Sequence, residues 1–189
     1  MKVLLRIFVR TAVAAALSGA AHRSQAAAVA DPTGTFTIED GRARVRLERC
    51  GAAQDRICGY IVWLKNPTDE RGQPARDRNN PDPEKRARAL LGHQLILGLK
   101  PTTAGRFEGD VYNSEDGKSY SIALWRESSD RVKVKGCLIK LLCSTQNWQQ
   151  TFDVMPGQLV GPTGDVNGPK ADREWVGPAP MKQTTAKAR

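Results

Sequence analysis

Strict alternation of apolar and polar residues between Arg106 and Phe152 constrains the fold of this chain more than any other feature. Apolar side chains take every second position through successive runs, and the positions between them are largely polar. The apolar positions are Phe107, Gly109, Val111, Tyr120, Ile122, Leu124, Val132 and Val134. A period of two gives an extended segment one buried and one solvent-exposed face, which is typical of an antiparallel meander. We therefore predict strands at Arg106–Tyr112, Lys118–Glu127, Arg131–Cys137 and Ser144–Phe152.

Four further strands are expected before this meander. Alternating or wholly apolar segments predict them at Thr35–Ile38, Ala43–Arg49, Cys58–Leu64 and Gln94–Lys100. Asp-Gly pairs within Glu39–Arg42 and Asn113–Lys118 supply the positive φ angles that tight hairpin turns require. Eight antiparallel strands with short turns can close on themselves, which removes exposed sheet edges. We therefore predict an all-β fold, a single small antiparallel up-and-down β-barrel.

The long connection Lys65–Gly92 is rich in Pro, Asn, Asp and Arg. Connections of this length are often functional. Asp82 followed by Pro83 is typical of a helix N-cap and first helical position, so we predict one short helix from Pro83 to about Leu90. The preceding segment Gly59–Leu64 is apolar on both faces. We expect the long connection to cover its outer face.

The first 30 residues have the order of a secretory signal peptide. Basic residues are followed by the apolar run Thr11–Ala21 and then by small residues ending at Ala30, which predicts cleavage after about Ala30. The apolar run is shorter than the roughly 20 residues that span a bilayer, and an uncleaved anchor is the alternative. No later segment of the sequence is apolar enough to span. We expect a periplasmic or secreted protein without a transmembrane segment after cleavage.

The charge of the exported chain is moderately basic. The predicted leader holds Lys2, Arg6, Arg10 and Arg23 and no acidic residue, so its removal lowers the net charge from +9 to +5. Such a chain suits anionic lipid, cell-wall polymer or an acidic partner better than nucleic acid, although solubility alone also explains the charge. Residues 155–189 are dense in Pro and Gly without apolar periodicity. This composition predicts a disordered basic tail.

The four cysteines form two close pairs, Cys50 with Cys58 and Cys137 with Cys143. In an oxidising compartment an even number of cysteines predicts disulfide bonds, and three connectivities are possible. Each close pair lies where one predicted strand ends and the next begins, so pairing within each hairpin is favoured. The spacing lacks the CxxC or histidine pattern of a zinc site, and we expect no metal.

The exported chain offers little for catalysis. His93 is its one histidine, and neither a Ser-His-Asp nor a Cys-His set can be assembled without it. We interpret His93 as structural and expect no enzyme and no cofactor. Asp77, Asn79 and Asp82 carry oxygens that suit calcium, but Pro81 breaks the EF-hand pattern. Asx turns and helix capping explain these three residues better.

Several short segments together resemble one known family. They are Gly59–Leu64, Asp77–Pro83, Leu91-Gly92, Gly98-Leu99, Val111–Asn113, Glu115–Tyr120, Val134–Gly136 and Thr145–Trp148. In this order they resemble the bacterial family catalogued as domain of unknown function 2147, over roughly Asp31 to Phe152. The resemblance implies export and a lipocalin-like barrel domain at residues 31–154, and it implies no reaction or ligand. The family usually carries arginines where this chain has Ser144 and Gln150, which puts an anion site there in doubt.

A strictly up-and-down topology places the long connection and three turns at one end of the barrel. We predict that this end is the mouth of a binding cavity, with a loop rim formed by Asp77, Asn79, Asn80, Leu138, Ile139 and Leu141. The apolar turn between Cys137 and Cys143 either forms this rim or folds inward as a plug. Pockets favour aromatic residues with a few polar groups. The candidate ligand-binding residues are Trp63, Tyr112, Tyr120, Gln146 and Trp148.

Two functions from different classes follow. The first is an exported barrel that binds a small apolar or amphiphilic molecule at its mouth, since a barrel of eight strands is either filled or holds one small ligand. The alternative is an envelope interaction protein with a solid barrel, which would bind an anionic envelope component through its basic tail and faces. Those faces are two basic rows, Arg42, Arg44 and Arg46 on one strand and Arg131, Lys133 and Lys135 on another. Ligand identity and oligomeric state stay open.

Overall fold

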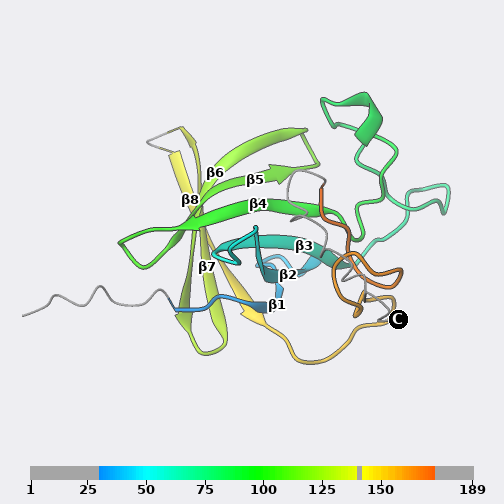
Figure 1. The fold of residues 1–189 in the computed structure, drawn as a ribbon. Coiled ribbons are helices and arrows are strands. Elements are labelled where there is room, and N and C mark those ends of the chain that lie inside the picture. Colours follow the sequence, from blue (N-terminus) through cyan, green and yellow to red (C-terminus); the bar gives the residue numbers. More distant parts are fainter. Residues whose placement is uncertain (1–29, 140–141, 173–189) are drawn as a thin grey trace, which may run out of the picture.

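The chain folds into a closed antiparallel barrel of eight strands (Figure 1). The computed structural model describes residues 30–139 and 142–172; residues 1–29, 140–141 and 173–189 lie outside the described part. The strands are β1 Gly34–Thr37, β2 Ala43–Cys50, β3 Arg56–Leu64, β4 Gln94–Pro101, β5 Phe107–Asn113, β6 Lys118–Ser128, β7 Arg131–Ile139 and β8 Leu142–Gln150. Each strand pairs with the next in sequence, and β1 closes the barrel against β8 through Phe36 opposite Gln150. All eight predicted strands and the up-and-down order are confirmed.

The alternation of apolar residues builds the core as expected. Every second residue of β5, β6 and β7 points into the barrel, where Phe107, Leu124 and Val132 are almost completely buried. Because this period continues in β2, β3 and β4, residues from all sides meet in one cluster. Its further members are Phe36, Val45, Leu47, Ile57, Ile96, Leu99, Ile122, Val134 and Trp148.

The two Asp-Gly turns form tight hairpins between β1 and β2 and between β5 and β6. Gly41 and Gly117 both have φ of 71°, which side chains with a Cβ rarely adopt. Gly117 is required for a second reason. A Cβ atom at this position would lie 1.9 Å from the carbonyl oxygen of Asn79 in the long connection. The β5–β6 turn and the connection therefore lie so close together that position 117 has no room for a side chain.

The predicted short helix is largely wrong. Asp82 does act as the N-cap, because its side chain accepts a hydrogen bond from the backbone N–H of Glu84 at 3.0 Å. The helix is a single 3-10 turn, η1 Pro83–Lys85, and the described residues contain no α-helix. The backbone beyond it pairs with the start of the same connection, since Asp77 N–H donates to the Arg88 carbonyl and Leu90 N–H to the Ala75 carbonyl. In a continuing helix, the Arg88 carbonyl and the Leu90 N–H would form hydrogen bonds within the helix instead.

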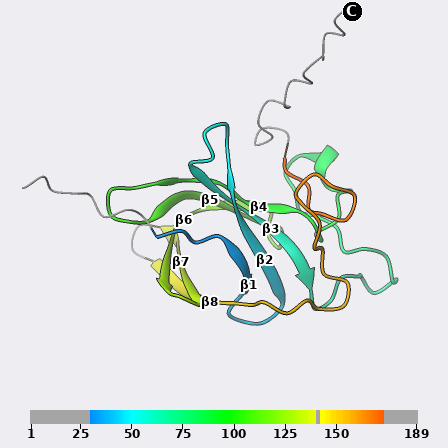
Figure 2. The same cartoon turned by 60° about the horizontal axis from the view of Figure 1, so that its bottom comes forward.

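The C-terminal segment, residues 153–172, is ordered against the barrel wall, in contrast to the tail predicted from residue 155. Leu159 N–H donates to the Val62 carbonyl, and Lys170 N–H donates to the Gly92 carbonyl, both at 2.9 Å. Leu159 and Ala171 pack on Cys58, Tyr60 and Val62, the outer apolar face of β3. The segment (yellow to orange) lies beside the long connection in both Figure 1 and Figure 2.

The outer face of β3 is therefore covered by a different segment from the one expected. We assigned this role to the Lys65–Gly92 connection, whereas the apolar contacts come from the C-terminal segment. The expectation that both faces of β3 need a cover is confirmed, because Tyr60 and Val62 are almost fully buried. The sequence correctly predicted that the outer face of β3 is covered, but the covering segment is the C-terminal segment and not the long connection.

Both predicted disulfide bonds are present and lie at opposite ends of the barrel. Cys50 and Cys58 join β2 to β3, and Cys137 and Cys143 join β7 to β8. The two bonds favour an oxidising, extracytoplasmic location. Among the described residues no helix is long and apolar enough to cross a bilayer. The predicted leader, and Trp175 in the predicted tail, lie outside the described residues.

Candidate functional site

One end of the barrel is open and encloses a cavity of about 660 Å³. The walls come from β4 through β8, and the lining is mainly apolar or aromatic. We call this space the apolar lobe. It is lined by Leu95, Val111, Tyr112, Asn113, Tyr120, Ile122, Val134, Gly136, Cys137, Leu142, Cys143, Ser144, Gln146 and Trp148. The volume is within the range of about 300–1,000 Å³ that is typical of small-molecule sites.

A second space of about 510 Å³ adjoins the first and has a more polar lining. We call it the polar lobe. It shares Leu95, Tyr112, Asn113, Gln146 and Trp148 with the apolar lobe, so the two form one divided cavity. Its own lining residues include Ile38, Arg42, Ile61, Lys65, Asn66, Leu90, His93, Ser114 and Glu115. These come from β1–β3, the long connection and the β5–β6 turn, which is the end where we predicted a mouth.

Four of the five candidate ligand-binding residues line this cavity: Tyr112, Tyr120, Gln146 and Trp148. Trp148 is 4% exposed and donates from Nε1 to the Gln146 side-chain oxygen at 2.8 Å. The Gln146 amide is thereby oriented, with its NH₂ group as the remaining donor. The Tyr120 hydroxyl donates to the Asp116 carboxylate in the β5–β6 turn. The shared face of Gln146 and Trp148 was correctly predicted.

Trp63 is not in the cavity. Its indole N–H donates to the Pro156 carbonyl at 3.2 Å, and the Arg44 guanidinium lies 5.9 Å from its ring centre. Both contacts are on the outer wall, under the C-terminal segment. The placement of this residue was wrong because β3 is apolar on both faces and a register shift falls between Arg44 and Val45 on its partner strand. Alternation could not decide which face of β3 looks inward.

Only part of the predicted loop rim lies within the described residues. Asn79 donates from its side chain to the Glu115 carbonyl at 2.7 Å, so it ties the long connection to the β5–β6 turn. Leu141, and the side chains of Leu138 and Ile139, lie outside the described residues. Leu142 is described; it is 61% exposed and lines the apolar lobe. For this residue, a position on the rim is favoured over a plug.

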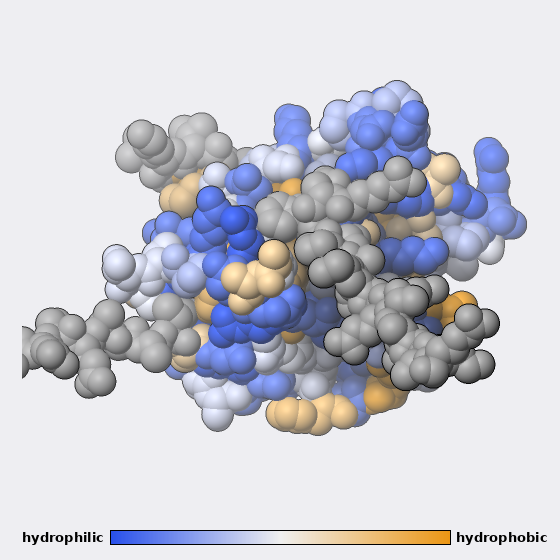
Figure 3. Space-filling view, viewed as in Figure 1, coloured by the Kyte–Doolittle hydropathy of each residue, from blue (hydrophilic) through white to orange (hydrophobic). Residues whose placement is uncertain are grey.

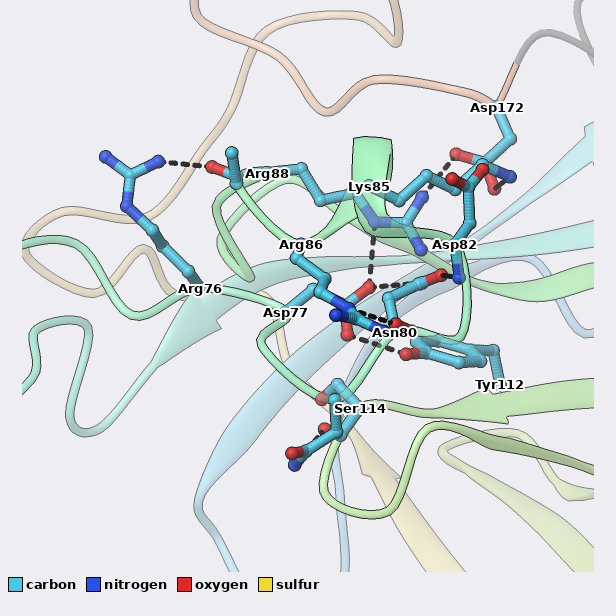
Figure 4. Close-up of polar contacts among 12 residues, drawn as sticks. Arg76, Asp77, Asn80, Asp82, Lys85, Arg86, Arg88, Tyr112, Ser114 and Asp172 are labelled. Carbon is cyan, nitrogen blue, oxygen red and sulfur yellow. Dashed lines mark hydrogen bonds and ion pairs between the residues drawn. The ribbon is translucent and has the colours of Figure 1, made fainter.

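Asp77 and Asn80, predicted for the rim, instead form the buried centre of a polar cluster beneath it (Figure 4). Asp77 is completely buried, and its carboxylate accepts hydrogen bonds from the Tyr112 hydroxyl at 2.6 Å, the Asn80 amide at 2.7 Å and Arg88 Nε at 2.9 Å. Arg88 also donates to Asp172 at 2.8 Å. The cluster therefore connects the cavity wall, the long connection and the C-terminal segment.

The electrostatics of this cluster follow from its hydrogen bonds. Burial by itself would raise the pKa of Asp77, but the hydrogen bonds from Tyr112, Asn80 and Arg88 outweigh it and hold this pKa below its ordinary value. Burial and the hydrogen bond to Asp77 raise the pKa of Tyr112 to about 12. Asp77 is thus a stable anion, with its oxygens occupied by protein donors. Of the three residues considered for calcium, Asp77 is explained by this cluster, Asn79 by its hydrogen bond to the Glu115 carbonyl and Asp82 by its capping role.

His93 is the functional candidate that we undervalued. It lies immediately before β4 and lines the polar lobe, with its ring centre 5.4 Å from that of Tyr112. Burial lowers the pKa of His93 to about 4, with a smaller contribution from Arg88, so the ring is neutral near pH 7. A lone histidine in a run of apolar residues carries no sequence signal that distinguishes a core position from a site.

Other lining residues were also missed as site residues. Leu95, Val111, Ile122 and Val134 were identified or implied as inward positions of strands, which is equally true of core residues. Sequence periodicity indicates which side chains point inward. It does not indicate at which height of the barrel the interior stops being filled.

The basic rows behave differently from one another. Arg44 is 7% exposed and pairs with Asp153 at 2.9 Å, while Arg46 donates to the Gly161 carbonyl at 2.8 Å. The C-terminal segment therefore covers this part of the first row, which is not the exposed binding face that the alternative function requires. Lys133 of the second row pairs with Glu127 at 2.8 Å. On the face drawn in Figure 3, hydrophilic residues predominate around the long connection and apolar residues form small separate groups.

A comparison with protein families identifies the chain. Residues 34–150 match the model described as an uncharacterized protein conserved in bacteria, domain of unknown function 2147. The matched region runs from the first strand to the last, so the chain belongs to this family, as its motifs suggested. The C-terminal segment that covers β3 follows the matched region.

A comparison with solved structures supports the fold class. The chain is similar to protein HP1028 from Helicobacter pylori, which is described as belonging to the lipocalin family. The similarity has a TM-score of 0.55 at 18% sequence identity and covers 65% of this chain and 84% of HP1028. The barrel is thus lipocalin-like in fold. A search of curated proteins found no significant match.

Proposed function

We propose that this protein is an exported, non-enzymatic barrel that binds a small apolar or amphiphilic molecule at its open end. The observation that carries this proposal is the apolar lobe, a space of about 660 Å³ lined by side chains that include Val111, Ile122, Val134 and Trp148. An apolar molecule that enters this space removes both its own surface and the lining from water, which favours binding.

The polar groups at the site support an amphiphile over a pure hydrocarbon. The Gln146 side chain reaches both lobes, and its amide NH₂ can donate to a ligand oxygen. The polar lobe brings Asn66, Asn113 and His93 to the same space. Binding sites commonly combine an apolar lining with a few such groups, which orient the ligand.

Export is the second part of the proposal. It is supported by the charged, apolar and small-residue order of residues 1–30 and by the two disulfide bonds. We place the exported form in the periplasm or outside the cell. An absence of catalysis is the third part, and it is supported by the buried position of His93 and by the oxidised state of all four cysteines.

The alternative, an interaction protein with a solid barrel and basic binding faces, has less support. The barrel interior opens into the two lobes at one end. Arg44 and Arg46 are engaged by the C-terminal segment and so are withdrawn from any partner on that face.

Native mass spectrometry of the exported form, residues 31–189, tests the proposal. Gly136 lines the apolar lobe, and a Cβ atom there would meet Ile122 at an ordinary 3.5 Å. Gly136→Phe should therefore fold and fill part of the lobe. Lys135→Phe places the same ring on the outer face of β7 and serves as the matched control. We expect a bound small molecule or added lipid on wild type and on Lys135→Phe, and much less on Gly136→Phe.

Two results would contradict the proposal. One is a wild-type protein that carries nothing after purification and takes up no added lipid or apolar dye. The other is equal uptake by Gly136→Phe and Lys135→Phe, since ligand would then bind outside the barrel.

A further inference from the structure

His93 is a buried side chain whose two ring nitrogens have no hydrogen-bond partner among the described residues. The residue is 4% exposed. Its backbone is well satisfied, because its carbonyl accepts from Ile61 N–H at 2.9 Å and its N–H donates to the Leu90 carbonyl at 3.1 Å. The unsatisfied atoms are therefore confined to the imidazole ring of a residue that lines the polar lobe and also a separate hollow between the long connection and the C-terminal segment.

An unpartnered buried polar group is unusual and costly. Leaving a buried donor or acceptor without a partner costs about 1–3 kcal/mol, and each such group in a native structure calls for an explanation. A side chain of the same shape without nitrogen would avoid this cost at His93. A ligand that supplies the missing hydrogen bond when it enters the cavity explains why an imidazole stands there.

The neighbouring polar groups are engaged with other partners and do not supply that bond. The Asp77 carboxylate is the nearest anion in the cluster, and its oxygens already accept from Tyr112, Asn80 and Arg88. Arg88 in turn is divided between Asp77 and Asp172. The polar cluster of Figure 4 is thus bonded without His93. The His93 ring centre lies 5.4 Å from that of Tyr112 in this cluster, and the residue lines the polar lobe.

We infer that the ligand is an amphiphile whose uncharged hydroxyl-bearing head pairs with His93 in the polar lobe while its apolar part occupies the apolar lobe. This inference rests on the proposed function and adds the chemistry of the ligand. The two lobes meet at Tyr112, Gln146 and Trp148. A single molecule can therefore lie in both.

A hydroxyl group matches a neutral imidazole. The neutral ring has one N–H donor and one acceptor nitrogen, and a hydroxyl both donates and accepts. A charged head would lose its hydration on entering a buried site. Two cations line the polar lobe, Arg42 and Lys65. Arg42 is already paired with Asp40 and Glu115, and Lys65 is exposed to solvent, so neither offers a buried partner for an anionic head.

The test compares two probes with one acyl chain of the same length, a monoacylglycerol and the corresponding fatty acid. Binding to residues 31–189 is measured by calorimetry at pH 7.5 for wild type, His93→Phe and His93→Gln. His93→Phe keeps the ring and removes both nitrogens, whereas the amide of His93→Gln retains a donor and an acceptor. We expect His93→Phe to bind the monoacylglycerol about tenfold more weakly, as the loss of one hydrogen bond implies. His93→Gln should recover part of this loss.

A second measurement does not require a variant that folds. His93 is the one histidine of residues 31–189, so ¹⁵N-histidine labelling gives a single imidazole whose nitrogen shifts report its hydrogen bonds. We expect the monoacylglycerol to shift these signals while the ring stays neutral.

The outcomes separate the two proposals. If wild type binds neither probe nor an apolar dye, the proposed function fails. If wild type binds but His93→Phe binds equally well, or the imidazole signals do not move, the inference fails and the proposed function stands. Tighter binding of the fatty acid, with protonation of His93, would also overturn the inference, because the head would then be an anion.

Discussion

The two ends of this barrel are built from the same alternating strands, yet one end is filled and the other is hollow. At the filled end, Ile57, Leu99, Phe107 and Leu124 are essentially inaccessible to solvent. At the open end, Leu95, Val111 and Tyr120 are only partly buried and line the cavity, and Gln146 is exposed. Inward-pointing residues of the same barrel therefore fill the core at one end and line a cavity at the other. Which of the two a residue does depends on its height along the strand.

The physical basis of the difference is what closes each end. At the filled end, large side chains such as Phe36 and Phe107 belong to one closely packed buried cluster. At the open end, the long connection is tied to the barrel wall by the polar cluster around Asp77, which accepts from Tyr112 of β5 and from Arg88. The connection therefore borders the opening, and the apolar side chains of the barrel line the cavity next to it.

The strongest test of the comparison uses two leucines of the same strand. Leu99 of β4 is completely buried in the filled end, whereas Leu95 lines both lobes. We expect Leu99→Ala to lower the free energy of unfolding by about 3 kcal/mol, because it leaves a cavity in close-packed surroundings. Leu95→Ala enlarges an existing space and should cost about 1 kcal/mol. Urea unfolding followed by tryptophan fluorescence measures both; equal losses would mean that the two ends are packed alike.

The free energy of unfolding should fall in acid, and His93 at the open end should cause the first part of this loss. His93 has a folded-state pKa of about 4, below the roughly 6.5 of an unfolded chain. The unfolded state thus binds more protons between these values, so stability is full above pH 6.5 and falls by about 3 kcal/mol as the pH drops to 4. The lowered pKa of Asp77 acts in the same direction at lower pH, since its stabilisation is lost as the pH falls below the ordinary carboxyl range.

The control for this pH effect is His93→Phe. Its free energy of unfolding should be nearly constant between pH 6.5 and 4.5 and, at pH 7, equal to or above that of wild type, because two unpartnered nitrogens are removed. Denaturant curves at several pH values decide this. A variant that keeps the wild-type pH slope would show that other groups carry it.

The two disulfide bonds allow each end to be loosened separately. The loops that they close are similarly short, with sequence separations of 8 and 6, so each should contribute about 2 kcal/mol through the unfolded chain. Cys50 and Cys58 are also buried beneath the C-terminal segment. We expect the double serine variant of this pair to lose more stability than that of Cys137 and Cys143. The second variant should instead weaken ligand uptake, because both of its cysteines line the apolar lobe.

The smallest effect on stability is expected from the Arg42–Glu115 ion pair at the opening. Arg42 pairs with Glu115 from the opposite turn, and both side chains are well exposed. Exposed pairs contribute less than about 1 kcal/mol. Glu115→Gln should therefore leave the unfolding midpoint almost unchanged, with any small loss disappearing in high salt. A large loss would indicate that the opening is held together by charge.

Much of the fold was predictable because it depends on local patterns. The positions of all eight strands followed from side-chain alternation and from Asp-Gly turns, and the disulfides followed from the places where strands end. Four of the five candidate residues, Tyr112, Tyr120, Gln146 and Trp148, line the cavity because β5, β6 and β8 bring their ends together at one end of the barrel. Each of these inferences needs only neighbouring residues.

The failures share one cause, which is contact between segments far apart in the chain. Trp63 was placed inside the barrel, and residues 155–172 were predicted to be disordered. These two errors are connected, because the C-terminal segment covers the outer face of β3 and accepts the Trp63 indole N–H through Pro156. A Pro- and Gly-rich segment without periodicity can still be ordered when a neighbouring wall supplies apolar contacts and backbone hydrogen bonds.

The amino-acid sequence by itself determined the closed barrel, since a period of two and tight turns leave few other ways to bury one face of eight strands. It also favoured, among three possible connectivities, the cysteine pairing that the structure contains. Only the tertiary structure decided how much of the barrel interior is hollow, which face of β3 looks inward and why His93 lacks a partner. The physical reason is that alternation specifies direction at each strand, while cavities and covers depend on volumes and contacts contributed by residues distant in sequence.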